Sequence, residues 1–191
     1  MIGIQIDDRF QVNERLVQRG PIELYEGVDL EEGRLVWIKR LLSPLVQDLD
    51  FVENWEAQLL SVQALESPAI PHIHTWGRLP ENDLYQVEDI PQGSTLRRWS
   101  AARAPMAVAD SVSLIGAAAQ AVGLAHRDGV AHGGLSPETI FVGQRGAVVP
   151  EIEVSGWESG EVVSALYNAG ATVPERLARY LAPEQTLAPA P

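Results

Sequence analysis

The sequence predicts an α+β fold in two lobes, with an N-terminal antiparallel sheet carrying one main helix, followed by a partial, mainly helical C-terminal lobe. Two observations predict this class. Short apolar runs separated by turn residues fill most of the first lobe and are interrupted once by a run of helical period. After the turn-forming stretch Pro91-Gln92-Gly93-Ser94, the longest apolar pattern is helical. We therefore expect a lobe boundary near residue 90, giving domains 1–90 and 91–191.

The first lobe begins with strands. From Phe10 to about Arg40, the turn signals Gly20-Pro21 and Glu32-Gly33 separate apolar runs at hairpin distance. Two further runs lie on either side of a polar loop and have the same character. The expected strands are Ile22 to Val28, Leu35 to Ile38, Ile70 to Arg78 and Leu84 to Ile90.

A change of period predicts the helix of the first lobe. From Asp48 to about Glu66, apolar residues recur at the spacing of one helical face, and Ser67-Pro68 ends the pattern. The residues of this stripe are Val52, Trp55, Leu59 and Val62.

The second lobe is expected to contain an alanine-rich helix from Asp110 to His126, with Asp110 or Ser111 as its cap and Asp128-Gly129 as its end. One face carries Val112, Ile115, Ala119 and Val122. Its small residues would allow a neighbouring helix to approach closely. A short strand is expected at 152–154.

Composition and charge exclude several classes of function. The chain has no cysteine, which rules out disulfides and thiolate chemistry. Its formal charge of −12 disfavours binding to nucleic acid. The sequence shows neither a run of 18 apolar residues nor a signal-peptide start. We therefore expect a cytoplasmic chain without direct membrane contact.

Four strings then occur in a meaningful order. They are Val36-Trp37-Ile38-Lys39, the stretch Glu88 to Leu96, the stretch His126 to Pro137, and Tyr180-Leu181-Ala182-Pro183-Glu184-Gln185. Together they resemble the bacterial serine/threonine protein kinases: the lysine strand, the hinge, the catalytic loop and the A-P-E end of the activation segment. The resemblance runs from Phe10 to Gln185. Because only six residues follow Gln185, it also implies a fragment or a natural C-terminal truncation.

The resemblance implies a nucleotide pocket. Lys39 is similar to the lysine that holds the α- and β-phosphates, and its acidic partner should lie on the helix at 48–66. Glu56 fits by its local sequence, whereas counting back from Pro68 places Gln58 there, and a glutamine could not form the ion pair. Helical periodicity does not decide between Glu56 and Gln58.

The rest of that pocket is altered. The hinge backbone from Glu88 to Ile90 could hold adenine, but Trp37 stands where a small alanine is usual and would partly fill the space. In the stretch similar to the glycine-rich loop, the three glycine positions hold Val17, Arg19 and Ile22. A hairpin is still expected there, but a poor phosphate cradle. The resemblance therefore implies weak or absent nucleotide binding, at most of metal-independent ATP or ADP.

The loop His132-Gly133-Gly134-Leu135-Ser136-Pro137-Glu138-Thr139 is similar to the catalytic loop, and its chemical groups are changed. By this resemblance Gly134 replaces the catalytic aspartate and Gly133 the preceding arginine. Ser136 replaces the lysine that neutralises phosphate, and Thr139 the magnesium-binding asparagine. His132 is kept as a structural residue.

The stretch Ile152 to Glu158 is similar to the strand and D-F-G motif that hold the second magnesium ligand. There Gly156 replaces the aspartate, Trp157 the phenylalanine and Glu158 the glycine. A displaced carboxylate from Glu158, Glu138 or Glu153 could restore a magnesium site only with near-octahedral geometry. We expect surface carboxylates instead, with no metal site and no catalytic residue.

The resemblance thus implies a pseudokinase-like regulatory or protein-binding module of bacterial signalling, without phosphotransfer activity and with a protein partner. An alternative is an atypical active serine/threonine kinase that transfers the ATP γ-phosphate to protein hydroxyls, in whose favour stand Lys39 and Ala182-Pro183-Glu184. A third interpretation is a truncated product with neither activity nor a stable fold. The sequence does not indicate an oligomeric state.

Overall fold

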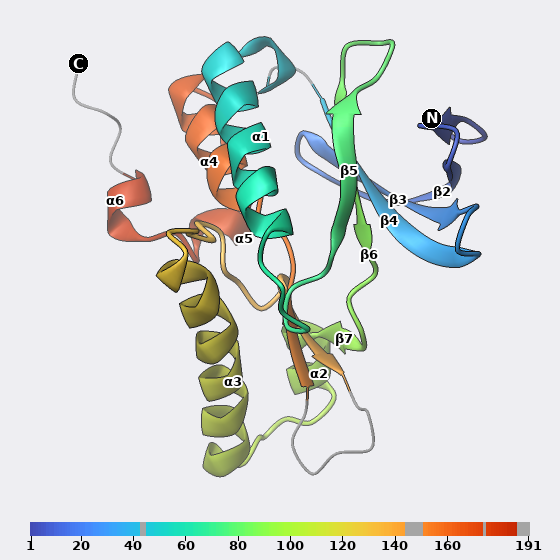
Figure 1. Cartoon of the computed structure of the whole chain (residues 1–191). Helices are drawn as coiled ribbons and strands as arrows, with labels where there is room; N and C mark the ends of the chain where they lie inside the picture. The colour runs from blue at the N-terminus through green and yellow to red at the C-terminus, as the bar shows by residue number, and fades with distance from the viewer. Residues whose placement is uncertain (43–44, 144–150, 174, 187–191) are drawn as a thin grey trace. The chain divides into compact units, whose positions relative to one another are not determined.

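The computed structural model describes residues 1–42, 45–143, 151–173 and 175–186, with the backbone alone at 176, 177 and 186 (Figure 1). The chain forms two compact units. The first contains Met1–Glu56 and His72–Ile90, and the second contains Ala57–Pro71 and Pro91–Pro191. The sequence-based boundary near residue 90 coincides with one of these divisions, while the second half of the first long helix groups with the second unit.

The first unit is built on a six-stranded antiparallel sheet in the order β1-β2-β3-β4-β6-β5. The strands are β1 (Gln5–Ile6), β2 (Phe10–Arg19), β3 (Ile22–Asp29), β4 (Arg34–Leu41), β5 (Ile73–Arg78) and β6 (Leu84–Asp89). The four predicted strands are confirmed. The strand expected from Ile70 begins at Ile73, because Pro71 has no N–H group to donate to a ladder.

Apolar side chains on one face of this sheet form its core. The cluster consists of Ile6, Phe10, Val12, Tyr25, Val36, Ile38, Leu79, Tyr85 and Val87. Burial of this face stabilises the unit, since apolar area removed from water contributes about 25 cal/mol per Å².

One strand buries carboxylates beside that core. Alternate residues of β3 face inward, so Glu23 and Asp29 are buried together with Tyr25. Asp29 is completely buried and accepts two hydrogen bonds from Arg9, from Nε at 3.0 Å and from Nη2 at 2.6 Å. It also accepts the N–H of Glu31 at 3.0 Å. These bonds, above all those from Arg9, lower the pKa of Asp29 to about 2.

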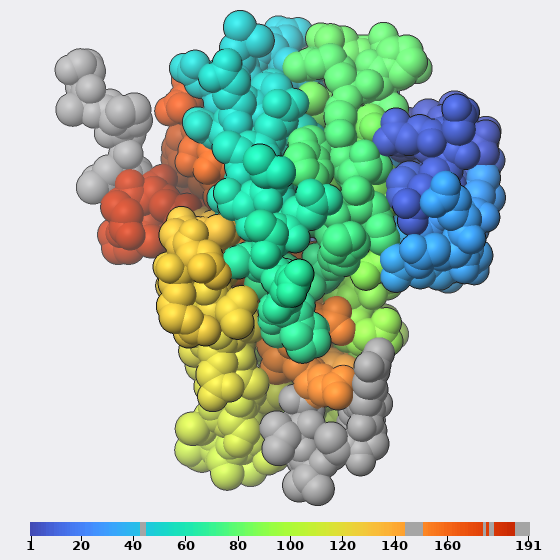
Figure 2. All heavy atoms as spheres, viewed as in Figure 1, coloured from blue at the N-terminus to red at the C-terminus, as the bar shows by residue number. Residues whose placement is uncertain are grey.

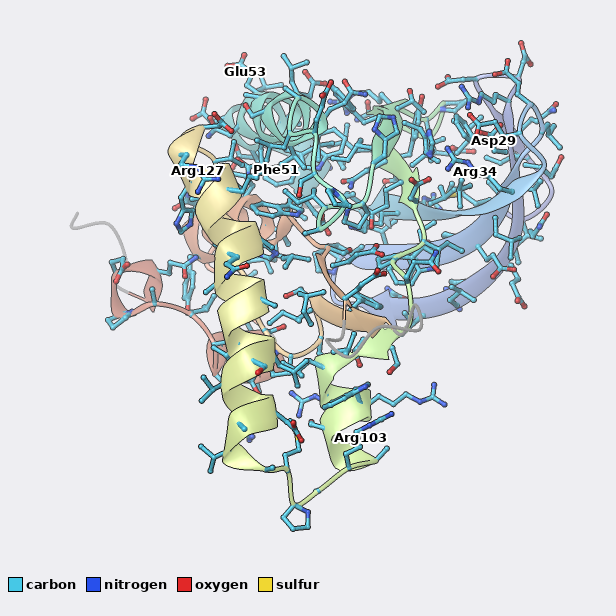
Figure 3. All side chains as sticks on the ribbon, turned by 60° about the horizontal axis from the view of Figure 1, so that its bottom comes forward. Asp29, Arg34, Phe51, Glu53, Arg103 and Arg127 are labelled. Carbon is cyan, nitrogen blue, oxygen red and sulfur yellow. The ribbon has the colours of Figure 1, made fainter. Side chains whose placement is uncertain are left out.

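The position of Asp29 at the end of β3 makes this network a staple for the β3–β4 hairpin. Asp29 pairs with Arg34 in the strand register, and Figure 3 shows both side chains at this end of the sheet. The N–H of Gly33 bonds to the carbonyl of Asp29 and closes the turn. The carboxylate of Asp29 therefore accepts hydrogen bonds from Arg9 and from the turn residue Glu31, while its carbonyl accepts one from Gly33 at the end of the turn.

The second unit combines helices with a three-stranded antiparallel sheet of order β7-β8-β9. Its strands are β7 (Ser94–Thr95), β8 (Ile140–Gly143) and β9 (Glu151–Val154). Its helices are α2 (Leu96–Ala101), α3 (Val108–Arg127), α4 (Ser159–Asn168), α5 (Glu175–Ala178) and α6 (Pro183–Thr186). The expected strand at 152–154 is confirmed as β9, whereas α4 has no counterpart among the predicted elements.

Helix α1 (Leu49–Gln63) confirms the predicted helix of the first lobe and follows the 3-10 turn η1 (Leu45–Gln47). All four residues of the predicted stripe, Val52, Trp55, Leu59 and Val62, are buried. The N–H of Phe51 donates to the carboxylate of Asp48 at 3.2 Å. Asp48 therefore caps the start of the helix, a role that the sequence analysis had not assigned to it.

Helix α3 corrects the predicted orientation. Its buried residues are Leu114, Ala118, Ala121, Val122 and Ala125. Of the predicted face only Val122 is buried, while Val112, Ile115 and Ala119 are exposed. The helix contacts β9, and three of its five buried residues are alanines. Figure 2 shows α3 uncovered on the surface of its unit.

The start of α3 also differs from the prediction. Its N-cap is Ala107 rather than Asp110 or Ser111, and Asp110 lies in the first turn, where a carboxylate interacts favourably with the helix dipole. The end at Asp128-Gly129 is confirmed, with Gly129 at φ 76°. Among the described residues, α3 is the one helix whose length and composition would suffice to cross a membrane, with 28% of that stretch buried; core helices of soluble proteins share these properties.

We predict that Asp29→Asn lowers the free energy of unfolding at pH 7 by about 2 kcal/mol, because a buried carboxylate with charge-assisted bonds is lost. Since the folded pKa of Asp29 is depressed to about 2, its contribution is present above pH 4 and disappears as the pH falls towards 2. Urea unfolding at several pH values should show a smaller acid-induced loss in this variant than in the wild type. Asp50→Asn, at an exposed position on α1, is the control. Equal acid sensitivity of both variants would contradict the assignment.

Candidate functional site

The loop after α3 is organised around one buried histidine. His132 is 2% exposed, and its Nε2 lies 3.0 Å from the carbonyl of Ser155. Its Nδ1 accepts the N–H of Gly134 at 3.2 Å. A carbonyl can only accept and an N–H can only donate, so both bonds together require the neutral tautomer with hydrogen on Nε2. The imidazole ring packs against Trp157, with 4.8 Å between ring centroids. The expected structural role of His132 agrees with this geometry.

The two glycines of the loop lie against the first residues of α4. A Cβ atom at Gly134 would lie 2.3 Å from the Cβ of Ser159. A Cβ at Gly133 would lie 2.6 Å from the Cα of Gly160, and Gly133 has a φ of 65°. Both separations are far below van der Waals contact. The space that a side chain at either position would need is thus occupied by α4.

A third glycine closes the same contact from the other side. Gly156, at φ 83°, would place a Cβ 2.9 Å from Cγ2 of Thr139 and 3.2 Å from Oγ of Ser159. Few residues other than glycine adopt this backbone conformation readily. Gly133, Gly134 and Gly156 therefore form a small cradle around Ser159 and Gly160, which we call the glycine cradle.

The hydroxyl groups of Ser136 and Thr139 take part in a local turn. The N–H of Ser136 donates to Oγ1 of Thr139 at 2.9 Å, and this hydroxyl donates back to the carbonyl of Ser136 at 3.0 Å. Oγ of Ser136 accepts the N–H of Glu138 at 3.2 Å. Ser136 is 4% exposed. These side chains shape the loop that leads into β8.

The three carboxylates considered as replacement metal ligands lie in different environments. Glu138 forms an ion pair with Arg97, which also donates to the hydroxyl of Tyr180 at 3.2 Å. Glu158 is buried at the start of α4, and Glu153 is half-buried on β9. Within the described ranges, no group of three or more histidine, aspartate or glutamate side chains is placed to hold a metal ion.

In the first unit, Lys39 forms a buried ion pair within the sheet. Its Nζ lies 2.9 Å from both carboxylate oxygens of Glu88. Lys39 and Glu88 are 5% and 3% exposed, and Nε2 of Gln86 donates to Glu88 at 2.6 Å. Lys39 pairs with Gln86 in the strand register, so these three side chains share one face of β4 and β6.

This pairing bears on the residues expected around a nucleotide. The sequence suggested a partner for Lys39 on α1, but Glu56 is exposed, and the carboxylate that the structure gives to Lys39 comes from β6. Glu88 was expected to contribute its backbone to the hinge, and its side chain is now engaged with Lys39. Ile90, half-buried, follows the end of β6. Two of the predicted pocket residues, Lys39 and Glu88, are thus linked by an ion pair that sequence reasoning did not foresee.

The stretch expected to replace a glycine-rich loop lies in the β2–β3 hairpin, where the strand register shifts between Arg15 and Val17. The strands β2 and β3 remain paired up to Arg19 and Ile22, and Val17 pairs with Leu24. The turn between them consists of Gly20 and Pro21 alone, with Gly20 at φ 61°. The expected hairpin is confirmed, and it is a tight one.

Two glutamine side chains bind the backbone of the loop at 131–134. Nε2 of Gln58 on α1 donates to the carbonyls of Ala131 at 2.8 Å and Trp157 at 3.2 Å. Nε2 of Gln185 on α6 donates to the carbonyl of Gly133 at 2.6 Å. Sequence reasoning singled out Gln58 for a different role and gave none to Gln185, because no local pattern reports a contact between residues so far apart in the chain.

Comparison with known proteins places this geometry in context. No protein-family model matches the chain. The chain is 23% identical to the serine/threonine-protein kinase PknA of Mycobacterium tuberculosis over 97% of its own length and 43% of PknA. It is 28% identical to PknB of Mycolicibacterium smegmatis over 94% of its length and 29% of PknB, and 24% identical to PrkC of Bacillus subtilis over 97% and 28%. It therefore spans less than half the length of these relatives.

Solved structures show the fold. The kinase domain of Mycobacterium tuberculosis PknI aligns with a TM-score of 0.72 at 19% identity, covering 94% of this chain and 71% of that one. The architecture is that of a protein kinase, with an N-terminal antiparallel sheet bearing one helix and a partial helical lobe. The chain is homologous, at low identity, to bacterial serine/threonine protein kinases.

We predict strong coupling between Lys39 and Glu88. Either Lys39→Met or Glu88→Leu should lower the free energy of unfolding by about 3 kcal/mol, because each removes a buried charge that faces the other. The double variant should be less destabilised than the sum by about 2 kcal/mol or more, as measured by urea unfolding. Glu175 on α5 and Arg179, which follows the end of that helix, form an exposed pair and provide a control cycle with coupling of about 0.5 kcal/mol or less. Additive losses at Lys39 and Glu88 would refute the coupling.

We predict that Gly134→Ala destabilises the protein by about 2 kcal/mol through collision with Ser159. Ser159→Gly removes the opposing Cβ and should restore most of this loss in the double variant. Gly123→Ala on α3, where a Cβ meets nothing within 4 Å, should be neutral or stabilising by about 0.5–1 kcal/mol. Thermal unfolding of the four variants tests the contact, and a neutral Gly134→Ala would disprove it.

Proposed function

We propose that this chain is a pseudokinase-like regulatory or protein-binding module, which keeps the kinase fold and lacks phosphotransfer activity. One observation carries the proposal: Ser159 occupies the space that a side chain at residue 134 would need. The resemblance to kinases assigns the catalytic aspartate to this position. The protein has no carboxylate there, and its local packing leaves no room for one.

The neighbouring groups support the same conclusion. Phosphoryl transfer depends on positioned charges and metal ligands around the transferred group. At the corresponding positions the hydroxyls of Ser136 and Thr139 are bonded within their own turn, and Gly156 has no ligand atom in its side chain. Because these losses concern separate parts of the machinery, a single relocated residue would not restore it.

We propose that nucleotide binding is weak or absent. Any ATP or ADP that binds would do so without a metal ion. A nucleotide phosphate would have to compete with Glu88 for Lys39, whose ion pair is buried and supported by Gln86. Breaking such a pair exposes two desolvated charges, which is costly unless the ligand replaces all their bonds. The pairing of β2 and β3 up to Arg19 and Ile22 likewise leaves no open glycine loop to receive phosphates.

A module without transfer chemistry would act through protein contacts, and a protein partner in the cytoplasm is our working proposal. The alternative of an atypical active kinase rests on Lys39 and on Ala182-Pro183-Glu184, which resemble the lysine and the A-P-E motif of kinases. The two functions differ in one measurable property, the metal-dependent use of ATP.

We predict no incorporation of phosphate into the chain or into a general protein acceptor when it is incubated with γ-labelled ATP and Mg²⁺ or Mn²⁺. The kinase domain of PknB serves as the positive control. Thermal unfolding with ATP should shift by less than about 1 °C, with or without metal, corresponding to negligible occupancy. Incorporation that is abolished by Lys39→Ala, or a metal-dependent rise in the unfolding temperature, would refute the proposal and support the active kinase.

A further inference from the structure

We propose that Gln58 and Gln185 form a two-sided amide clamp, which fixes the loop at 131–134 against the start of α4, and that a carboxylate at either position would open it. The inference concerns the conformation of the second unit and holds whether or not the chain transfers phosphate.

The first side of the clamp is Gln58, on the half of α1 that belongs to the second unit. Its Nε2 is shared by two backbone carbonyls, Ala131 at 2.8 Å and Trp157 at 3.2 Å. Because both partners are acceptors, only the nitrogen end of the amide can face them. One side chain therefore ties the loop before Gly133 to the segment that leads into α4.

The second side is Gln185 on α6. Its Nε2 donates to the carbonyl of Gly133 at 2.6 Å, while its Oε1 accepts the N–H of Ala182 at 3.0 Å. Donor and acceptor ends of the amide are both used, which again fixes its orientation. The backbone bond from the N–H of Gln185 to the carbonyl of Ala182 holds the side chain in place.

Between these two amides lies the glycine cradle. Gly133 and Gly134 have no side chain with which to hold their own conformation, and Gly133 has a φ of 65°. Glycine loses more conformational entropy on ordering than any other residue. The bonds from Gln185 to Gly133 and between Gly134 and His132 offset this cost. The bond from Gln58 holds the backbone of the neighbouring Ala131.

The chemistry of the clamp is specific for amides. Three carbonyl oxygens receive the two side chains, and a carboxylate would present negative charge to the negative ends of these dipoles while donating nothing. A carboxylic acid, when protonated, can donate one hydrogen bond. A glutamate in either position should therefore open the loop when it is ionised. When it is protonated, it should leave the loop in its closed conformation. Alanine would lose the bonds at every pH.

The experiment compares Gln58→Glu with Gln58→Ala and with Gln120→Glu, which adds the same charge at an exposed position of α3 in the same unit. In Gln58→Glu the folded pKa of the new carboxyl should lie above its unfolded value of about 4.3, because ionisation is disfavoured beside carbonyls. The loss of stability caused by the ionised carboxylate is thus complete at high pH and disappears as the pH falls through that pKa.

The expected result is a drop in the unfolding temperature of Gln58→Glu by about 5 °C or more at pH 7.5 relative to Gln120→Glu, with much of the difference recovered at pH 5. Gln58→Ala should show a loss that does not change with pH. A pH-independent loss in Gln58→Glu would overturn the amide-specific clamp, and so would stability equal to that of Gln120→Glu.

Hydrogen exchange gives a local readout. In Gln58→Glu at pH 7.5, the amides of residues 133–135 should exchange about tenfold faster, while those of α3 stay unchanged. Gln185→Glu should accelerate the same amides and remains informative if Gln58→Glu fails to fold. Unchanged exchange at 133–135 in Gln185→Glu would reject the clamp.

Discussion

The contact between the glycine cradle and the first residues of α4 is the constraint on which the second unit depends. Ser159 and Gly160 can begin the helix where they do only because Gly133, Gly134 and Gly156 present no side chain to them. In a densely packed interior, a methyl group at Gly133 would collide with the backbone of Gly160, and one at Gly134 or Gly156 with the side chains of Ser159 or Thr139. The cradle in turn sets the direction of α4, whose Val162, Val163 and Leu166 are buried. The glycines are therefore a packing requirement at the start of α4.

Burial of charge follows a different rule in the first unit. The sheet keeps Lys39 inside and supplies Glu88 from the adjacent strand, with Gln86 as a further donor to the carboxylate. A buried pair of this kind is weak evidence for stability, since its desolvation offsets much of the attraction. Removal of one partner is nevertheless unfavourable. The two residues can therefore be retained for stability alone, because replacing either one leaves the other charge buried without its partner and lowers the free energy of unfolding.

Sequence reasoning succeeded where the information is local or periodic and failed where it is not. The stripe on α1 and the β3–β4 hairpin follow from spacing and turn residues, and both are confirmed. On α3 both sides of the helix carry apolar residues, so periodicity could not choose between Ile115 and Leu114. By its resemblance to kinase motifs, Gly134 stands at the position of the catalytic aspartate. The position of Ser159, however, depends on α4, which was not among the predicted helices. The helical spacing of Val162, Val163 and Leu166 was the signal that could have predicted it.

The loop and its surroundings show how neutral contacts can replace charged ones. An aspartate or lysine in a catalytic loop needs water, metal or a counter-ion, because an isolated charge in a packed interior is strongly disfavoured. Here glycine, serine and threonine stand at those positions, and the remaining backbone groups are bonded by the amides of Gln58 and Gln185 and by a neutral His132. Neutral donors and acceptors can be buried once each bond is made. Neutral residues at these positions thus allow α4 to pack closely onto the loop, and that packing would oppose a charged side chain at residue 134.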